Sequence, residues 1–200
     1  MGLTPAAALA EAAAAARACR LCAPQLPLGP RPIFQLDAAA RLLLVSQAPG
    51  TRAHLSGIPW NDKAGDRLRD WLGLDRAGFY GPGLAILPMG LCYPGRLPRG
   101  GDAPPRPECA PLWHPRLAPP LRHLRLTLLL GRYAIASRLG PAAARDLAGT
   151  VAGYAGLLRQ GVFALPHPSW RTRAWAAARP WFEAEALPAL RQAVAAALAP

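Results

Sequence analysis

Four short apolar runs alternate along the chain with longer segments in which apolar residues recur at helical spacing. The runs are residues 42–46, 84–87, 124–130 and 161–165. Apolar runs that end in turn residues are typical of buried parallel strands. Helices are predicted at residues 4–18, 66–72, 108–117, 132–139 and 174–198, the last interrupted near Pro180 and Pro188. This alternation predicts an α/β fold, a three-layer α/β/α sandwich with a central, mostly parallel four-stranded sheet in one domain over residues 1–200.

The segments that join these elements differ in character. Residues 24–32 are rich in proline and are predicted to be extended, and residues 33–36 are predicted to form a short edge strand. Residues 51–65 are predicted to be mostly irregular, and a loop of that length in a compact domain is usually functional. Residues 95–107 are rich in Arg, Gly and Pro. They form either a basic edge that contacts phosphate, through Arg96 and Arg99, or an ordinary solvated loop.

Two of the predicted strands end in turns that carry chemically interesting groups. The strand at residues 42–46 leads into Gln47, Ala48, Pro49 and Gly50, and the strand at residues 161–165 leads into His167. In open α/β sheets, ligands bind beyond the carboxyl ends of the strands. We therefore expect a functional site where these two turns converge, although either turn alone is equally consistent with a plain strand end.

The charge balance of the chain favours a polyanionic partner. The net charge is +12, and Lys63 is the only lysine. Nucleic acid is the first candidate partner, while a GC-rich coding bias would account for part of the arginine excess. No apolar run is long enough to span a bilayer, and the alanine-rich start contains Glu11 and Arg17, as expected of a helix and not of a signal peptide. We expect a cytoplasmic, nucleoid-associated monomer with no membrane partner.

The four cysteines are arranged as a close pair and two distant members. Cys19 and Cys22 are separated by two residues, and Cys92 and Cys109 follow on either side of the arginine-rich loop. A disulfide framework is not expected in a cytoplasmic protein of this size. Four cysteines so placed suit a [4Fe–4S] cluster or tetrahedral zinc, and the alternative is four unrelated thiols.

Several motifs in the same order resemble the uracil-DNA glycosylase superfamily, and most closely its iron–sulfur-containing family 4. Ser-Gln-Ala-Pro-Gly at residues 46–50 is similar to the first motif of that family, Gly-Glu-(Ala/Gly)-Pro-Gly. Ser-Gly-Ile-Pro-Trp-Asn-Asp-Lys-Ala-Gly at residues 56–65 is similar to its Thr/Ser-Gly-x-Pro-Phe-Val-Gly-x-Ala-Gly segment. His-Pro-Ser at residues 167–169 is similar to its second motif, and the cysteine spacings match those of its cluster ligands. The resemblance extends from about Cys19 to about Arg171.

The resemblance implies a DNA repair enzyme that flips a base into a pocket and hydrolyses its glycosidic bond. Trp60 would stack on the flipped base, and His167 would donate to a uracil carbonyl oxygen and stabilise the developing negative charge. Arg171 and Arg173 would contact phosphate or fill the gap left by the base. The pocket would be lined by Gln47, Ala48, Pro49, Gly50 and Ser169, and the cluster would be held by Cys19, Cys22, Cys92 and Cys109.

The chain departs from the family pattern at the positions that carry its chemistry. Ala48 cannot orient water as the aspartate of family 1 does, and Gln47 replaces the glutamate of family 4. Pro88 aligns with the asparagine that recognises the uracil edge and has neither a polar side chain nor an amide proton. Our hypothesis is that Asn61 recognises the base and that Asp62 or His54 positions the water. The alternative is that Asn61 and Asp62 only cap the helix that follows.

Three functions are therefore weighed. The first is a monofunctional DNA glycosylase acting on uracil or a related deaminated base, because neither motif contains the lysine that a Schiff-base lyase route needs. The second is a protein on the same fold that binds DNA lesions or single strands without cleaving them. The third is a metal-stabilised hydrolase of small nucleotides, which the basic charge disfavours. Salt-dependent DNA binding would separate the first two from the third.

Overall fold

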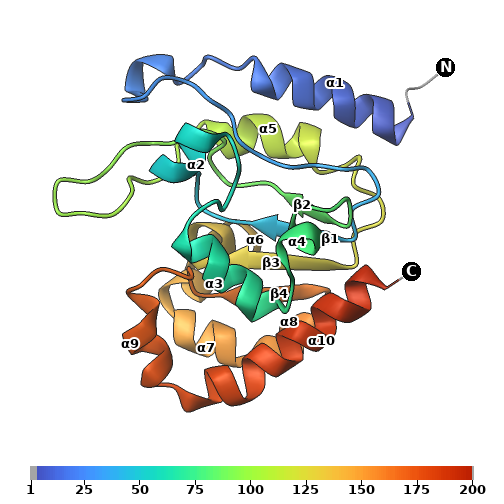
Figure 1. The fold of residues 1–200 in the computed structure, drawn as a ribbon, viewed down its shortest axis with the longest axis vertical. Helices are drawn as coiled ribbons and strands as arrows, with labels where there is room; N and C mark the ends of the chain where they lie inside the picture. The colour runs from blue at the N-terminus through green and yellow to red at the C-terminus, as the bar shows by residue number, and fades with distance from the viewer. Residues whose placement is uncertain (1–3, 200) are drawn as a thin grey trace.

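The computed structural model describes residues 4–199 and confirms a central parallel sheet between two layers of helices (Figure 1). The sheet has the order β2-β1-β3-β4. Its strands are β1 (Leu42–Val45), β2 (Leu84–Ile86), β3 (Leu126–Leu130) and β4 (Val162–Leu165). Every pairing between these strands is parallel, so their carboxyl ends lie along one edge of the sheet.

Both faces of the sheet are buried, which explains why the strands are continuous apolar runs. On one face, Leu42 and Leu44 of β1 belong to a core that includes residues of the helices packed on that side. Those elements are α3 (Lys63–Leu72), α4 (Arg76–Phe79), the π-helical segment η2 (Phe182–Ala186) and α10 (Leu187–Leu198). On the other face, Leu43 and Val45 pack with α1 (Pro5–Arg17), α5 (Cys109–Leu117) and α6 (Gly131–Arg145). Side chains that alternate along one strand therefore belong to two separate cores.

The ends of two helices follow the signals expected from the sequence. The hydroxyl of Thr4 accepts a hydrogen bond from the Ala7 amide at the start of α1, with Pro5 in the first turn. Helix α3 begins three residues earlier than predicted, directly after Asp62, and ends at Gly73 in the left-handed conformation. These ends matter because the segment before α3 forms part of the pocket described below.

Two predictions about the first half of the chain were wrong. Residues 51–56, predicted to be irregular, form the short helix α2 (Thr51–Ser56), which Gly57 terminates with a φ of 74°. Only Ala53 and His54 of this helix are buried, so it has no apolar stripe that would have predicted it. The expected edge strand at residues 33–36 is reduced to a single antiparallel bridge between Gln35 and Ile86. Residues 24–32 include the end of a short 3-10 helix, η1 (Ala23–Gln25).

The second half of the chain is more helical than predicted. Helix α6 runs on to Arg145 across a kink at Gly140, and α7 (Leu147–Ala152) and α8 (Tyr154–Leu158) precede β4. The C-terminal helix is interrupted before Pro180, where α9 (Thr172–Ala177) has ended, but Pro188 lies in the first turn of α10 without breaking it. The π-helical turn η2 directly precedes α10, and a proline in the first turn of a helix needs no amide partner. Within residues 4–199, no helix combines the length and apolarity that crossing a bilayer requires.

Candidate functional site

A pocket opens at the carboxyl edge of the sheet, where loops from several strands meet. Its walls come from the turns after β1, β2 and β4, from the segment before α3, and from the long loop after β2. The residues that line it are Ile33, Ser46, Ala48, Pro49, Gly50, Ala53, Pro59, Trp60, Asp62, Ile86, Pro88, Asp102 and His167. The two strand-end turns expected to converge therefore do so.

Backbone hydrogen bonds hold the turns after β1 and β2 together at the floor of this pocket. The Ser46 carbonyl accepts from the Met89 amide at 2.8 Å, and the Gln47 carbonyl accepts from the Gly90 amide at 2.9 Å. These bonds continue the pairing of β1 with β2 beyond the strands themselves. Ala48 and Pro88 are thereby fixed as neighbouring parts of one wall.

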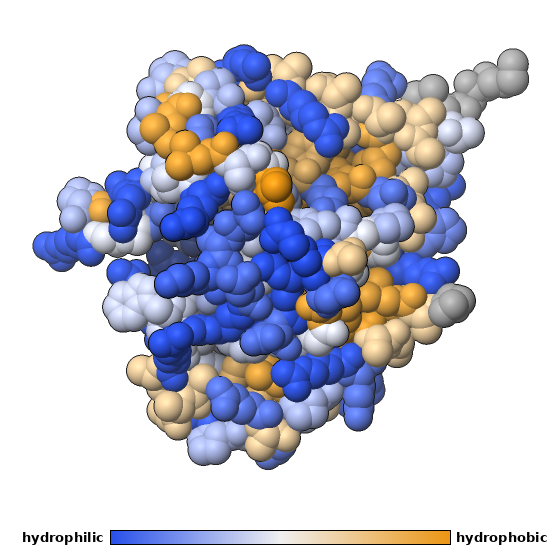
Figure 2. All heavy atoms as spheres, in the orientation of Figure 1, coloured by the Kyte–Doolittle hydropathy of each residue, from blue (hydrophilic) through white to orange (hydrophobic). Residues whose placement is uncertain are grey.

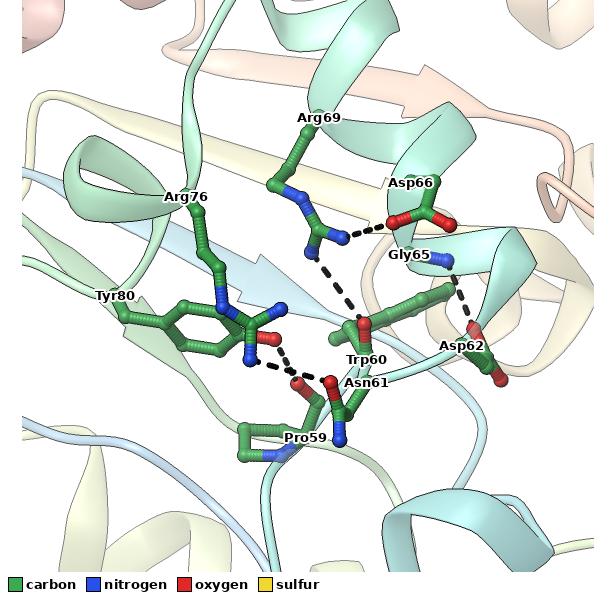
Figure 3. Close-up of polar contacts among 9 residues, drawn as sticks. All are labelled: Pro59, Trp60, Asn61, Asp62, Gly65, Asp66, Arg69, Arg76 and Tyr80. Carbon is green, nitrogen blue, oxygen red and sulfur yellow. Dashed lines mark hydrogen bonds and ion pairs between the residues drawn. The ribbon is translucent and has the colours of Figure 1, made fainter. Parts of the chain in front are cut away.

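Trp60 is held in place by a network of backbone and side-chain contacts (Figure 3). It is the only non-glycine residue among those described with a positive φ, at 58°. Arg69, which is buried, donates to the Trp60 carbonyl at 3.4 Å and forms an ion pair with Asp66 at 2.5 Å. The Tyr80 hydroxyl donates to the neighbouring Pro59 carbonyl at 2.7 Å. A left-handed conformation at a bulky residue is a strain that persists only where the surroundings enforce it, often at functional sites.

His167 lies against Trp60 in the pocket. The two rings have centroids 5.4 Å apart and are tilted by 30°. Burial lowers the pKa of His167, and the carboxylate of Asp62 opposes this shift only in part. The imidazole is therefore neutral at pH 7 and can donate one ring N–H without carrying a charge. Gly131 faces this histidine with a φ of 76°, a backbone conformation that glycine adopts readily, and a Cβ there would be in ordinary contact with the His167 Cβ at 3.5 Å.

Two carboxylates line the pocket, and they are bonded differently. Asp62 accepts a hydrogen bond from the Gly65 amide at 2.8 Å and so caps α3. Asp102 comes from the loop after β2 and has no side-chain hydrogen bond or ion pair with any residue in the range 4–199 (the whole part of the chain that the structure describes). Asp102 is exposed as a residue, but partial desolvation of its carboxyl group raises the pKa of Asp102, an effect opposed by Arg96 and reinforced by Asp62.

Four residues expected in the site lie outside the lining of the pocket. The Gln47 amide donates to the Ala103 carbonyl at 2.8 Å, so it anchors the long loop. Asn61 accepts from Arg76 at 3.2 Å, next to Pro59 and away from Asp62 (Figure 3). His54 is buried in α2 beside Tyr93, and the Ser169 carbonyl accepts from Arg67 at 2.8 Å. Their positions favour structural roles over direct contact with a ligand.

Sequence reasoning placed Ser46 in the first motif without assigning it a role, and it missed Asp102. Ser46 is buried at the last position of the predicted strand, and it stands where the family motif has glycine. Asp102 is the only acidic residue of the loop at 95–107, which otherwise carries arginines, and this exception in a basic segment was the available signal. The pocket thus contains polar groups that a search for the family pattern alone would overlook.

Exposed arginines lie on two segments that border the pocket, the loop at 95–107 and the chain after His167. Arg96, Arg99, Arg171 and Arg173 are all exposed. The guanidinium of Arg171 reaches from the turn after β4 to the tip of the long loop, where it lies 3.1 Å from the position that a Cβ on Gly101 would occupy. In Figure 2, hydrophilic residues spread across the middle of the face that carries α2, α3 and this loop. Part of the positive charge of the chain therefore lies around the opening of the pocket.

The four cysteines line a second cavity, on the other side of the turn after β2. Cys19 and Cys22 follow α1, Cys92 follows β2 and Cys109 begins α5. Burial raises the pKa of Cys92 and of Cys109 to about 11. Among the described residues, no three Cys, His, Asp or Glu side chains already stand in the arrangement of a metal ion's ligands. The cavity nevertheless brings together every cysteine of the chain, and the Leu91 amide donates to Cys109 at 3.2 Å.

Comparison with protein families gives one match that covers most of the chain. The family is described as the uracil DNA glycosylase superfamily, and its model matches residues 33–191. The matched region contains the sheet, the pocket and the turns after β1 and β4, whereas Cys19 and Cys22 precede it.

Proposed function

Because the chain belongs to the uracil DNA glycosylase superfamily, we propose that it is a DNA base-excision repair glycosylase. The proposed reaction hydrolyses the N-glycosidic bond of uracil or a related deaminated base and leaves an abasic site. One observation carries the proposal: the pocket at the sheet edge joins a fixed aromatic face, Trp60, to a half-buried neutral imidazole, His167. Base flipping delivers a flat heterocycle to such a pocket.

Each of these two groups has a distinct part in the proposed reaction. The Trp60 ring offers a π face on which any flipped base can stack. His167 donates its ring N–H to a carbonyl oxygen of the base, where negative charge accumulates as the glycosidic bond breaks. A neutral imidazole suits this role, because it is already desolvated and needs no reorganisation when the charge develops.

At the position where the family recognises uracil, the pocket has no polar side chain. Pro88 lines the wall at that position, and its carbonyl oxygen is engaged by His114 at 3.1 Å. Asn61, the substitute considered from the sequence, faces Arg76 instead. Ser46, the first residue of the first motif, is a buried polar residue of the pocket lining, and we propose that it contributes to base recognition.

The second candidate function is a DNA-lesion or single-strand binding protein that does not cleave. Two observations favour it: Pro88 supplies no polar side chain, and Gln47 is committed to the Ala103 carbonyl. This candidate shares the fold, the arginines and the pocket with the first. Only excision of a base separates the two.

We further propose that Cys19, Cys22, Cys92 and Cys109 hold a [4Fe–4S] cluster of the family 4 type, with zinc as the alternative. Support comes from the donor set: four thiols from three separate segments surround one cavity, the Arg106 guanidinium faces Cys22, and the Leu91 amide donates to Cys109. Bound there, the cluster or the zinc ion would cross-link the segments that follow α1 and β2 to the start of α5. It would take part in no redox step. Iron and acid-labile sulfide in anaerobically purified protein would support the cluster, whereas one equivalent of bound zinc would support the zinc site instead.

The excision test uses single-stranded and duplex DNA that carry one deaminated base, namely uracil, hypoxanthine or xanthine. Alkali cleaves the strand wherever an abasic site has formed. The glycosylase proposal expects strand cleavage by the wild-type protein and at least a 100-fold slower single-turnover rate for His167→Ala, consistent with the loss of an electrostatic donor. Binding to every substrate without excision would overturn it in favour of the binding protein.

A further inference from the structure

The hydrolysis of a glycosidic bond needs a water molecule that is oriented toward the sugar, and the expected residues do not supply it. Ala48 has no polar group, and Gln47 is bonded to Ala103. His54 lies outside the pocket lining, in α2. Asp62 lines the pocket, but its carboxylate already accepts the Gly65 amide as a helix cap. The pocket contains one other carboxylate, Asp102.

The loop that carries Asp102 is anchored on both sides of this residue. Arg96 and Asp102 form an antiparallel bridge, and the Ala103 amide donates to the Gly95 carbonyl at 2.9 Å. The Ala103 carbonyl accepts from the Gln47 side chain at 2.8 Å, which ties the loop to the turn after β1. The position of Asp102 is therefore set by its neighbours, and its own carboxylate remains free.

The carboxylate of Asp102 is directed toward the turn after β1. Its Oδ2 lies 3.4 Å from the position that a Cβ on Gly50 would occupy. Gly50 belongs to the first motif, and the resemblance to the family implies that the peptide groups of this motif lie beside the sugar of a flipped nucleotide. A carboxylate that lacks a protein donor and faces this turn is placed to accept a hydrogen bond from water.

We propose that Asp102 is the catalytic carboxylate that orients the attacking water and accepts its proton, an inference that rests on the proposed glycosylase function. In this step the water oxygen forms a bond to C1′ of the sugar while the bond between C1′ and the base nitrogen breaks. The electron pair of that bond leaves with the base, which His167 stabilises. The proton of the water passes to Asp102, and the departing base takes up a proton from solvent.

A pH dependence follows from the groups that face Asp102. Partial desolvation raises its pKa, Arg96 in the same loop opposes the rise, and Asp62 from the start of α3 adds to it. The guanidinium of Arg171 packs on the neighbouring Gly101, and the neutral His167 shares the pocket. The excision rate should therefore fall on the acid side as Asp102 becomes protonated, at a higher pH than for an ordinary aspartate.

The experiment compares the wild type with Asp102→Asn under single-turnover conditions across pH, on the substrate that the wild type excises. Asp75→Asn is the control, because Asp75 lies outside the pocket lining and its side chain accepts the Gly78 amide at the start of α4, a hydrogen bond that asparagine can also accept. We expect Asp102→Asn to lose about 100-fold or more in rate, to lack the acid limb, and to keep wild-type melting and affinity for DNA with an abasic site. The Asp75→Asn variant should stay within about twofold of the wild-type rate.

The outcomes separate the two proposals. Excision by the wild type with an Asp102→Asn rate within about threefold, or with an unchanged acid limb, overturns the role of Asp102 and leaves the glycosylase intact. A rate lost together with melting temperature and product affinity assigns Asp102 a purely structural role and also overturns the proposal. A wild type that excises no base from any substrate overturns the glycosylase function itself, and the role of Asp102 with it.

Discussion

At the scale of single residues, the shape of the pocket depends on how closely the backbone approaches itself around Trp60. Gly65 lies so near that a Cβ there would stand 1.8 Å from the Trp60 carbonyl oxygen. The same carbonyl accepts a hydrogen bond from Arg69, and Trp60 itself has a left-handed backbone conformation. The absence of a side chain at residue 65 is thus a requirement for the position of the aromatic wall.

We predict that Gly65→Ala destabilises the protein and impairs excision together. The added methyl group must displace the Trp60 carbonyl, so the free energy of unfolding should fall by about 1–3 kcal/mol, the usual cost of overpacking. Thermal unfolding and single-turnover excision measure the two effects. Gly156→Ala in α8 is the control: its nearest neighbour would be Arg159 Nη2 at 3.7 Å, and alanine should stabilise that helix by up to about 1 kcal/mol. Equal melting temperatures for Gly65→Ala and Gly156→Ala would contradict this explanation.

A second prediction separates two roles of Asp62, which caps α3 and also lines the pocket. Asparagine can accept the same hydrogen bond from the Gly65 amide, whereas alanine cannot. Asp62→Ala should therefore lose about 0.5–2 kcal/mol of unfolding free energy, and Asp62→Asn should lose little. If the cap is the main role, Asp62→Asn also retains most of the excision rate. A large loss of rate with unchanged melting would instead make Asp62 catalytic.

At the scale of elements, the sequence predicts those parts of the fold whose physical cause is local. The strands were predicted to within two residues, because a fully buried strand must be apolar at every position, as β1 is. The two turns of the pocket followed from the same runs. Helix α2 was missed because its ends are defined by Gly50 and Gly57 and its sequence carries no apolar stripe.

The parts of the site that the sequence did not predict depend on long-range contacts. Asp102 enters the pocket because a loop folds back and its carbonyl at Ala103 binds Gln47, 56 residues away. Asn61 and Asp62 are adjacent in sequence, yet one faces Arg76 and the other lines the pocket. Neither periodicity nor propensity predicts where these side chains point, because their partners from distant parts of the chain determine it.

We predict that Gln47→Glu, which restores the residue of the family motif, loosens the loop at 95–107 and slows excision. A carboxylate cannot donate to the Ala103 carbonyl and would repel it, so the loop at 95–107 should detach from the turn after β1. Limited trypsin digestion after the exposed Arg99 should become faster, and excision slower. Gln47→Ala, which removes the donor without adding charge, should lie between the glutamate variant and the wild type. Faster excision by the glutamate variant would show that the side chain acts as it does in the family.

At the scale of the whole molecule, the two edges of the parallel sheet differ in what they carry. The carboxyl edge bears the pocket, the long loop and the arginines at its opening. The opposite edge also bears arginines, including Arg122, which is exposed between α5 and β3. Since both edges are basic, net charge alone does not say where DNA binds.

The last prediction uses salt dependence to locate the DNA-binding edge. Each phosphate contact to single-stranded DNA contributes about 0.7 to the slope of log affinity against log salt. Arg99→Ala should lower that slope by about this amount, because Arg99 is exposed on the loop at 95–107 and its loss removes charge without unpacking the fold. Arg122→Ala removes the same charge from the opposite edge and should leave the slope unchanged. Fluorescence anisotropy of a labelled oligonucleotide over a series of salt concentrations measures both. Equal losses in the two variants would mean that DNA responds to the overall charge of the protein and not to the edge that carries the pocket.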